Sequence, residues 1–193
     1  MDKPRNAQEY IAEQRKAIAS NPECGTSRYN LAVALMGVQE YAEAEKELLA
    51  AIDNSPGLAE AYVQLGALCL RQNDLEGCLD WNQRAVKARP GFSEGHGNIG
   101  FVHLQMGNLE DGIKSLERAT HFNFRYIQAF ATLGSAYLMN GEVEKSIDAC
   151  KKALKVEPDF PIAHNNLAIA LMEKGDFKQA IEHADRAVAL GYD

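Results

Sequence analysis

Residues 59–92 read AEAYVQLGALCLRQNDLEGCLDWNQRAVKARPGF, and the same pattern returns every 34 positions along most of the chain. Aligning the sequence with itself at this period gives five repeats, which span residues 25–58, 59–92, 93–126, 127–160 and 161–193. A period of about 20–50 residues is typical of proteins built from stacked units, in which each unit packs on the next. The repeat therefore decides the fold before any local motif does.

Fixed positions within the repeat hold side chains of one size. The seventh position is always a branched aliphatic residue (Leu31, Leu65, Ile99, Leu133, Leu167). The eighth is always small (Ala32, Gly66, Gly100, Gly134, Ala168), and so is the twentieth (Ala44, Cys78, Gly112, Ser146, Ala180). The twenty-seventh is always alanine (Ala51, Ala85, Ala119, Ala153, Ala187). Large and small residues at fixed positions let packed helices interdigitate, so these columns predict a layered helical core.

Each repeat contains two helical patterns separated by a turn. In the second repeat, four residues follow the i, i+3, i+4, i+7 spacing of one helix face (Tyr62, Leu65, Gly66, Cys69). Asn73, which glycine replaces in the three later repeats, suits a left-handed helix end. The second helix should stop near Pro90, because proline cannot continue a helix interior. With one more helix before residue 25, the sequence predicts eleven helices and no strands.

This pattern resembles the tetratricopeptide repeat (TPR). The fourth repeat matches its order of an aromatic residue, Leu-Gly, tyrosine, a small residue, alanine and proline (Phe130, Leu133, Gly134, Tyr137, Ser146, Ala153, Pro158). Local departures are Phe124 and Tyr192 in place of proline, and Arg28 and His96 in place of the first aromatic residue. The resemblance implies an all-α fold, a right-handed α-α superhelix of antiparallel helix pairs. Members of the family mostly bind proteins or peptides in a concave groove.

Residues 1–24 match half a repeat ahead of the first full one. Asn6 with a glutamate three residues later resembles a capping box, which marks a helix start, and Pro22 falls in phase with Pro56. We expect an N-terminal capping helix that shields the first repeat, as terminal units of solenoids do. A remnant of a longer array is the alternative. Residues 25–193 are then expected to form one continuous solenoid domain.

The composition excludes several classes of partner. The chain of 193 residues carries 20 Lys and Arg against 27 Asp and Glu, a formal net charge of −7. This acidic balance argues against binding to nucleic acid or to anionic membranes. No stretch approaches the roughly 18 apolar residues of a membrane span, and the first residues lack the apolar core of a signal peptide. We expect a cytoplasmic protein, unless a targeting segment has been removed.

Neither the cysteines nor the histidines predict a metal site. The four cysteines contain no C-x-x-C pair, and three of them lie in core columns. His96 and His103 lie two helical turns apart, but they occupy columns that hold aromatic residues or cysteine in other repeats, so we expect them to pack. We therefore expect no metal and no cofactor.

Residues 95–100 spell G-x-G-x-x-G, which indicates a dinucleotide site only between a strand and a helix. Here the motif falls inside an expected helix, so nucleotide binding is not predicted. Three of the glycines Gly95, Gly97, Gly100 and Gly112 exceed what the small-residue columns require, and each should weaken its helix by up to ~1 kcal/mol. The carboxylates lie on expected solvent faces without a nucleophile or base beside them, so we expect that the protein is not an enzyme.

The resemblance also implies which side chains contact a ligand. In the family the second, fifth, sixth, ninth, twelfth and thirteenth positions face the concave groove. The residues expected to bind a peptide are Asn30, Val33, Gln64, Arg71, Asn98, Phe101, Thr132, Ser135, Asn166 and Ile169. Carboxamides fill the sixth position in four repeats. Each can donate and accept a hydrogen bond, so this ladder suits the backbone of an extended peptide.

Two classes of function remain open. The first is a scaffold or adaptor that binds an extended peptide or protein segment in the groove. The second is a structural self-assembly protein that forms a homo-oligomer through its terminal helices, because no polar capping helix follows the fifth repeat in the sequence. The identity of the partner does not follow from the sequence.

Overall fold

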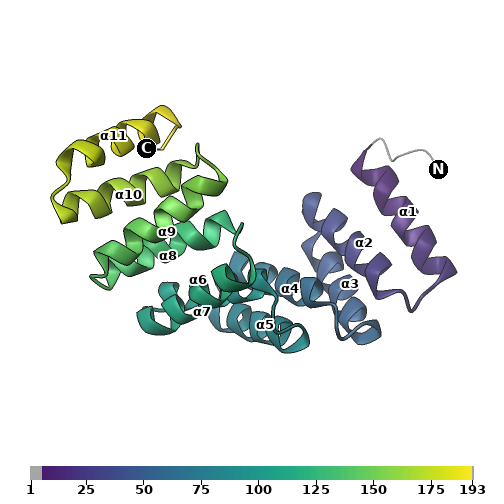
Figure 1. Cartoon of the computed structure of the whole chain (residues 1–193). Coiled ribbons are helices and arrows are strands. Elements are labelled where there is room, and N and C mark those ends of the chain that lie inside the picture. Colours follow the sequence, from purple (N-terminus) through teal and green to yellow (C-terminus); the bar gives the residue numbers. More distant parts are fainter. Residues whose placement is uncertain (1–5, 193) are drawn as a thin grey trace. The chain divides into compact units, whose positions relative to one another are not determined.

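The computed structural model describes residues 6–192, and within that range every regular element is an α-helix (Figure 1). The prediction of an all-α fold of antiparallel helix pairs is confirmed for this range. The helices are α1 (Ala7–Ser20), α2 (Gly25–Gly37), α3 (Tyr41–Asn54), α4 (Ala59–Arg71), α5 (Leu75–Ala88), α6 (Ser93–Gln105), α7 (Leu109–Phe122), α8 (Ile127–Met139), α9 (Val143–Val156), α10 (Pro161–Lys174) and α11 (Phe177–Ala189).

The first helix of each pair begins where a repeat begins in the sequence. The starting residues of α2, α4, α6, α8 and α10 are 25, 59, 93, 127 and 161. The chain divides into an N-terminal unit, Met1–Gly95, and a C-terminal unit, His96–Asp193, and the division falls inside α6. One continuous domain over residues 25–193 stays a prediction.

The turn inside each helix pair has a common backbone conformation. One residue per turn has a positive φ, between 59° and 85° (Gln39, Asn73, Gly107, Gly141, Gly175). The following N–H then donates to a carbonyl oxygen five residues earlier, as from Asp74 to Cys69 at 2.9 Å. This geometry satisfies the last carbonyls of the first helix and reverses the chain. The predicted left-handed helix end at Asn73 is confirmed.

Small residues let the two helices of a pair approach until their backbones nearly touch. The eighth position of a repeat lies against the twentieth. A Cβ atom added to Gly100 would stand 3.0 Å from the carbonyl oxygen of Gly112, and one added to Gly66 would stand 3.3 Å from that of Cys78. The interior is close-packed at these positions, so a larger side chain would not fit without moving the opposite helix.

Gly95 and Gly97 lie outside the small-residue columns, and both have close neighbours. A Cβ atom on Gly95 would approach Val86 Cγ1 to 2.8 Å, and one on Gly97 would approach Tyr126 Cε1 to the same distance. These glycines make room for neighbouring side chains. Closer packing around these glycines therefore offsets part of the stability that their low helix propensity costs.

Each unit has its own hydrophobic core. In the N-terminal unit the core includes Leu31, Leu48 and Leu65, and α1 contributes Ile11, which covers the first full repeat. The Asn6 side chain accepts the N–H of Glu9 at 2.9 Å, which forms the expected cap of α1. The cores of the C-terminal unit lie between α7 and α11 (Leu116, Leu133, Tyr137, Ile147, Leu167, Leu171).

We expect Gly100→Ala to lower the thermal midpoint of unfolding and Gly37→Ala to raise it. The methyl group at position 100 would meet Leu116 and the Gly112 carbonyl, which costs about 1–3 kcal/mol. On Gly37 the same atom would meet nothing within 4 Å, so alanine gains up to about 1 kcal/mol of helix propensity. Circular dichroism during heating measures both. A Gly100→Ala protein as stable as the parent would show that the helix pair does not need this space.

Candidate functional site

Two of the predicted ligand contacts in the N-terminal unit lie together. Asn30 and Val33, on α2, line a hollow of about 430 Å³ that Tyr10 and Tyr29 also line. Val33 is exposed, so the hollow presents an apolar side chain next to a carboxamide. Such a recess can hold one side chain of a peptide and pair with its backbone.

Gln64 and Arg71, on α4, make contacts within the protein. The side chain of Gln64 lies near the Tyr29 hydroxyl group and lowers the pKa of Tyr29, against the rise that burial mainly causes. The guanidinium group of Arg71 lies over the ring of Tyr41, 3.5 Å from its centre, in a cation–π contact. Both side chains therefore lie beside tyrosines of the N-terminal unit.

The other six predicted contacts belong to the first helices of the C-terminal unit. Asn98 and Phe101 lie on α6, Thr132 and Ser135 on α8, and Asn166 and Ile169 on α10. The apolar members of this set face solvent, since Phe101 is 39% exposed and Ile169 is 46% exposed. Asn98 makes an interaction within the protein, as do many half-buried carboxamides.

Asn166 and Thr132 donate their side-chain hydrogen bonds to the protein itself. Asn166 is only 8% exposed, and its amide group donates to the carbonyl oxygen of Ala131 at 3.0 Å, which ties α10 to α8. The Thr132 hydroxyl group donates to the carbonyl oxygen of Gln128 at 2.8 Å, one turn earlier in α8. The carboxamide ladder as a ligand-binding device therefore stays a prediction.

A second set of contacts joins the fourth and twenty-third positions of a repeat. In the first repeat, Arg28 donates to Glu47 at 2.8 Å. In the second, the rings of Tyr62 and Trp81 are 6.2 Å apart. In the fifth, the Nδ1 atoms of His164 and His183 are 2.9 Å apart. Each pair brings the first and second helices of its repeat together through side chains of matching chemistry.

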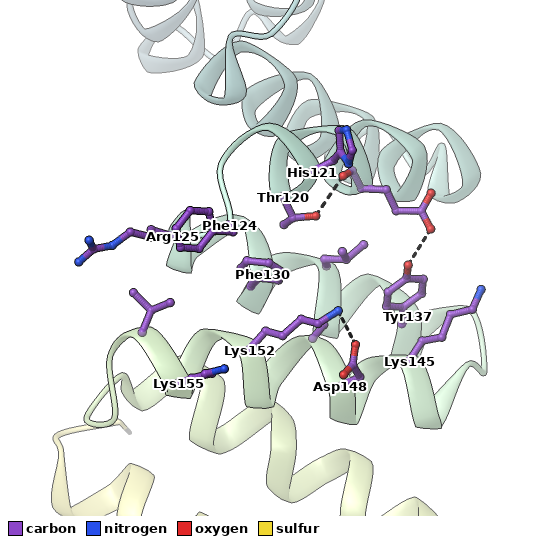
Figure 2. A pocket seen from close by; sticks show the side chains of 14 residues that line it. Thr120, His121, Phe124, Arg125, Phe130, Tyr137, Lys145, Asp148, Lys152 and Lys155 are labelled. Carbon is purple, nitrogen blue, oxygen red and sulfur yellow. Dashed lines mark hydrogen bonds and ion pairs between the residues drawn. The ribbon is translucent and has the colours of Figure 1, made fainter.

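In the fourth repeat this pair is Phe130 and Ala149, and both line a cavity of about 920 Å³. We call it the Phe130 cavity. Figure 2 shows side chains of α7, α8 and α9 around it, with Lys152 and Lys155 on the side opposite Phe124 and Arg125. With 3.6 residues per turn, Phe130 and Thr132 point about 160° apart on α8, so this cavity is separate from the predicted groove.

Polar contacts order the wall of the Phe130 cavity. The Tyr137 hydroxyl group donates to Glu117 at 2.7 Å, and burial together with this bond raises the pKa of Tyr137. Lys152 forms an ion pair with Asp148 at 2.7 Å. Both carboxylates that line the cavity therefore already have a partner.

None of the residues that line the Phe130 cavity was among the predicted contacts. The signal was present in the sequence as a mismatch between two columns. Arg28 with Glu47 and Tyr62 with Trp81 are paired by charge or ring type, whereas Phe130 has only Ala149 opposite it. Comparing the fourth and twenty-third positions across repeats singles out the third and fourth repeats, where His96 faces Ser115 and Phe130 faces Ala149.

No helix among residues 6–192 has the length and apolarity to cross a membrane. In the same part of the chain, no group of three His, Cys, Asp or Glu side chains is placed to hold a metal ion. Burial raises the pKa of the Cys78 and Cys150 thiols to about 11, which keeps them protonated as small core side chains.

The model of one protein family, the tetratricopeptide repeat, matches residues 3–59, 29–91 and 131–191, which is most of the chain. The chain belongs to the tetratricopeptide repeat family. Residues 92–130 lie outside these matches, and they contain the third repeat with its additional glycines and with Phe124 in place of proline. No curated protein matches the chain significantly.

Solved structures of several proteins share this TPR fold. YrrB, a TPR protein with an unusual peptide-binding site, is 20% identical with a TM-score of 0.74, over 95% of this chain and 94% of YrrB. MamA of Desulfovibrio magneticus RS-1 is 22% identical with a TM-score of 0.71, over 86% and 94%. The APC/C hetero-tetramer Cut9-Hcn1 gives 18% identity and a TM-score of 0.80, over 96% of this chain and 37% of the other. Identities this low show the fold alone.

The histidines that meet between α10 and α11 predict a pH dependence of stability. Burial, and after it the ring of His164 and the charge of Lys151, lower the pKa of His183, while Glu182 acts in the opposite sense. Because the folded state then binds fewer protons than the unfolded state, stability is complete above the unfolded pKa of about 6.5 and falls as the pH drops below it.

We expect the thermal midpoint of the parent protein to decrease between about pH 6.5 and pH 5, and to decrease less in His183→Gln. Calorimetry over this range in matched buffers measures the effect. Parallel pH profiles for the parent and His183→Gln would contradict this assignment.

Proposed function

We propose that the chain binds an extended segment of a partner protein along the exposed faces of its first helices. Members of the TPR family typically mediate protein–protein interactions and are generally not enzymes. The proposed contacts are the ten predicted residues, four in the N-terminal unit and six in the C-terminal unit. A cytoplasmic location stays an expectation from the sequence.

The observation that carries the proposal is a recurrence of exposed apolar side chains on the first helices. They occupy the ninth and twelfth positions of the repeat (Val33, Leu70, Phe101, Ile169, Met172), and all five are exposed. Single exposed apolar residues are normal, but apolar side chains that recur in one register favour an interaction surface. Methionine and phenylalanine also adapt well to varied apolar partners.

Carboxamides next to these side chains supply the polar part of the proposed site. Asn30 borders the same hollow as Val33, and Asn98 lies one turn before Phe101 on α6. A carboxamide can bond both the N–H and the carbonyl group of an extended chain without reading its sequence. The buried Asn166 contributes differently, because its bond to Ala131 holds α10 in place.

We expect Asn98→Ala to weaken binding of the native partner by about 1–2 kcal/mol, because partner groups lose a hydrogen bond. Phe101→Ala should weaken it by a similar amount through lost apolar contact. Gln83→Ala, at an exposed position of α5 outside the predicted set, is the matched control and should bind like the parent. Affinity purification with the parent identifies the partner, and calorimetry with the purified partner measures each variant.

The double variant Asn98→Ala with Phe101→Ala decides the outcome. If the double variant binds the partner as tightly as the parent protein does, the binding surface lies elsewhere. Selective loss of that partner, with Gln83→Ala unchanged, supports the proposal.

Self-assembly is a second candidate function, and one feature of α11 favours it. Phe177, Ile181, Ala184 and Val188 are all exposed and follow the i, i+4, i+7, i+11 spacing of one helix face. Their counterparts on α9 belong to or pack against the core shared with α10 (Val143, Ile147, Cys150, Leu154). The exposed face of α11 therefore has the chemistry of a surface that packs on the first helix of another repeat.

If this face mediates self-assembly, Ile181→Lys should abolish association of the parent protein, because a lysine there cannot be buried without a partner charge. Leu49→Lys, at an exposed apolar position of α3, is the control and should leave association unchanged. Sedimentation velocity over a range of concentrations measures both. A parent protein that stays monomeric at high concentration excludes the second candidate.

A further inference from the structure

The Phe130 cavity lies in a repeat whose twenty-third position holds a small side chain, as in the third repeat (Ser115) but not in the other three. Trp81 and His183 occupy the twenty-third position in the second and fifth repeats, and each meets its partner across the helix pair. Ala149 carries a single methyl group at this position. The cavity volume of about 920 Å³ lies in the range of ligand pockets, roughly 300–1,000 Å³.

The inner wall of the cavity is apolar. It is formed by Phe130 and Leu133 on α8 and by Ala149 and Val156 on α9. At its edge stands Phe124, whose side chain is 75% exposed and which replaces the proline found there in other repeats. An exposed aromatic ring next to an apolar recess is a feature of protein-binding surfaces.

The opening of the cavity is positively charged, although the chain carries a net charge of −7. Its lining includes four cationic residues (Arg125, Lys145, Lys152, Lys155) and two carboxylates (Glu117, Asp148). Tyr137 and Lys152 already engage the two carboxylates, and Lys145 pairs with Glu142. Arg125 and Lys155 form no ion pair with any of residues 6–192. These two cations are therefore available to a ligand.

We propose that the Phe130 cavity is a second docking site, for an acidic segment of a partner protein. The segment inserts one aromatic or large aliphatic side chain against Phe130 and sets a carboxylate near Arg125 and Lys155. A nucleic acid or an anionic membrane would need a wider basic surface than this recess offers on an acidic chain. The site uses none of the ten residues of the proposed groove, so it can be present whether or not that groove binds a ligand.

A random peptide library displayed on phage tests the ligand chemistry. The library is selected on the immobilised full chain, after depletion on the Ala149→Trp protein. Ala149→Trp places in the cavity, next to Phe130, the side chain that the second repeat holds at the same position. We expect enriched peptides in which Phe, Trp or Leu is flanked by Asp or Glu. Absence of such enrichment, or equal recovery on Ala149→Trp, overturns the proposal.

The enriched peptide, synthesised with a fluorescein label, then maps the site by fluorescence anisotropy. Ala149→Trp should weaken its binding at least about tenfold, since the indole ring takes up the space next to Phe130 that the inserted side chain needs. Arg125→Glu combined with Lys155→Glu, at two exposed positions, should weaken it to a similar extent, and rising salt should weaken binding to the parent. Circular dichroism establishes that each variant is folded.

The groove variant Asn98→Ala with Phe101→Ala is the matched control and should bind this peptide within about twofold of the parent. The charge-reversed protein keeps the test decisive if Ala149→Trp does not fold. Unchanged affinity after charge reversal overturns the proposal. Loss of binding in the groove variant alone would assign the peptide to the groove instead.

Discussion

The close approach of two helix backbones within each repeat is the constraint on which the rest of the structure depends. Where the eighth position is glycine, as at Gly66 and Gly100, even one added carbon atom would crowd the carbonyl oxygen of the opposite helix. In the first and fifth repeats the eighth position is a buried alanine, Ala32 and Ala168. This spacing brings the branched residues of the seventh position into the core and leaves only chosen side chains exposed.

The fold could be predicted because its determinants recur at a fixed period. The positions that hold residues of one size predict which side chains face inward, and Asn73 predicts the turn. The starts of the first helices then follow from the 34-residue period. Gln39 could not be predicted from its residue type, because glutamine rarely adopts the left-handed conformation. Only its alignment with the glycine or asparagine of the other repeats predicts the positive φ of 65°. Backbone conformation here is set by the position in the repeat, against the preference of the residue.

The candidate sites were less predictable because they depend on distances between side chains from different columns. The column of Asn166 places it on the ligand face, yet its amide group reaches the Ala131 carbonyl of the preceding first helix. The Phe130 cavity depends on a difference in volume between Ala149 and its counterparts Trp81 and His183. Periodicity describes what the repeats share, whereas these features depend on how single repeats differ from the others.

The shared left-handed turn has a consequence for how such a chain can be altered. Every helix pair closes with the same hydrogen bond, from the residue after the positive-φ position to a carbonyl oxygen five residues earlier. This hydrogen bond joins backbone atoms only, so the turn has the same geometry whatever side chains flank it. Each helix pair is therefore a structural module that is closed by the same turn. Replacing one helix pair by another changes its interfaces with the two neighbouring repeats and leaves the other turns unchanged. The side chains that contact a partner can therefore change in one repeat at a time.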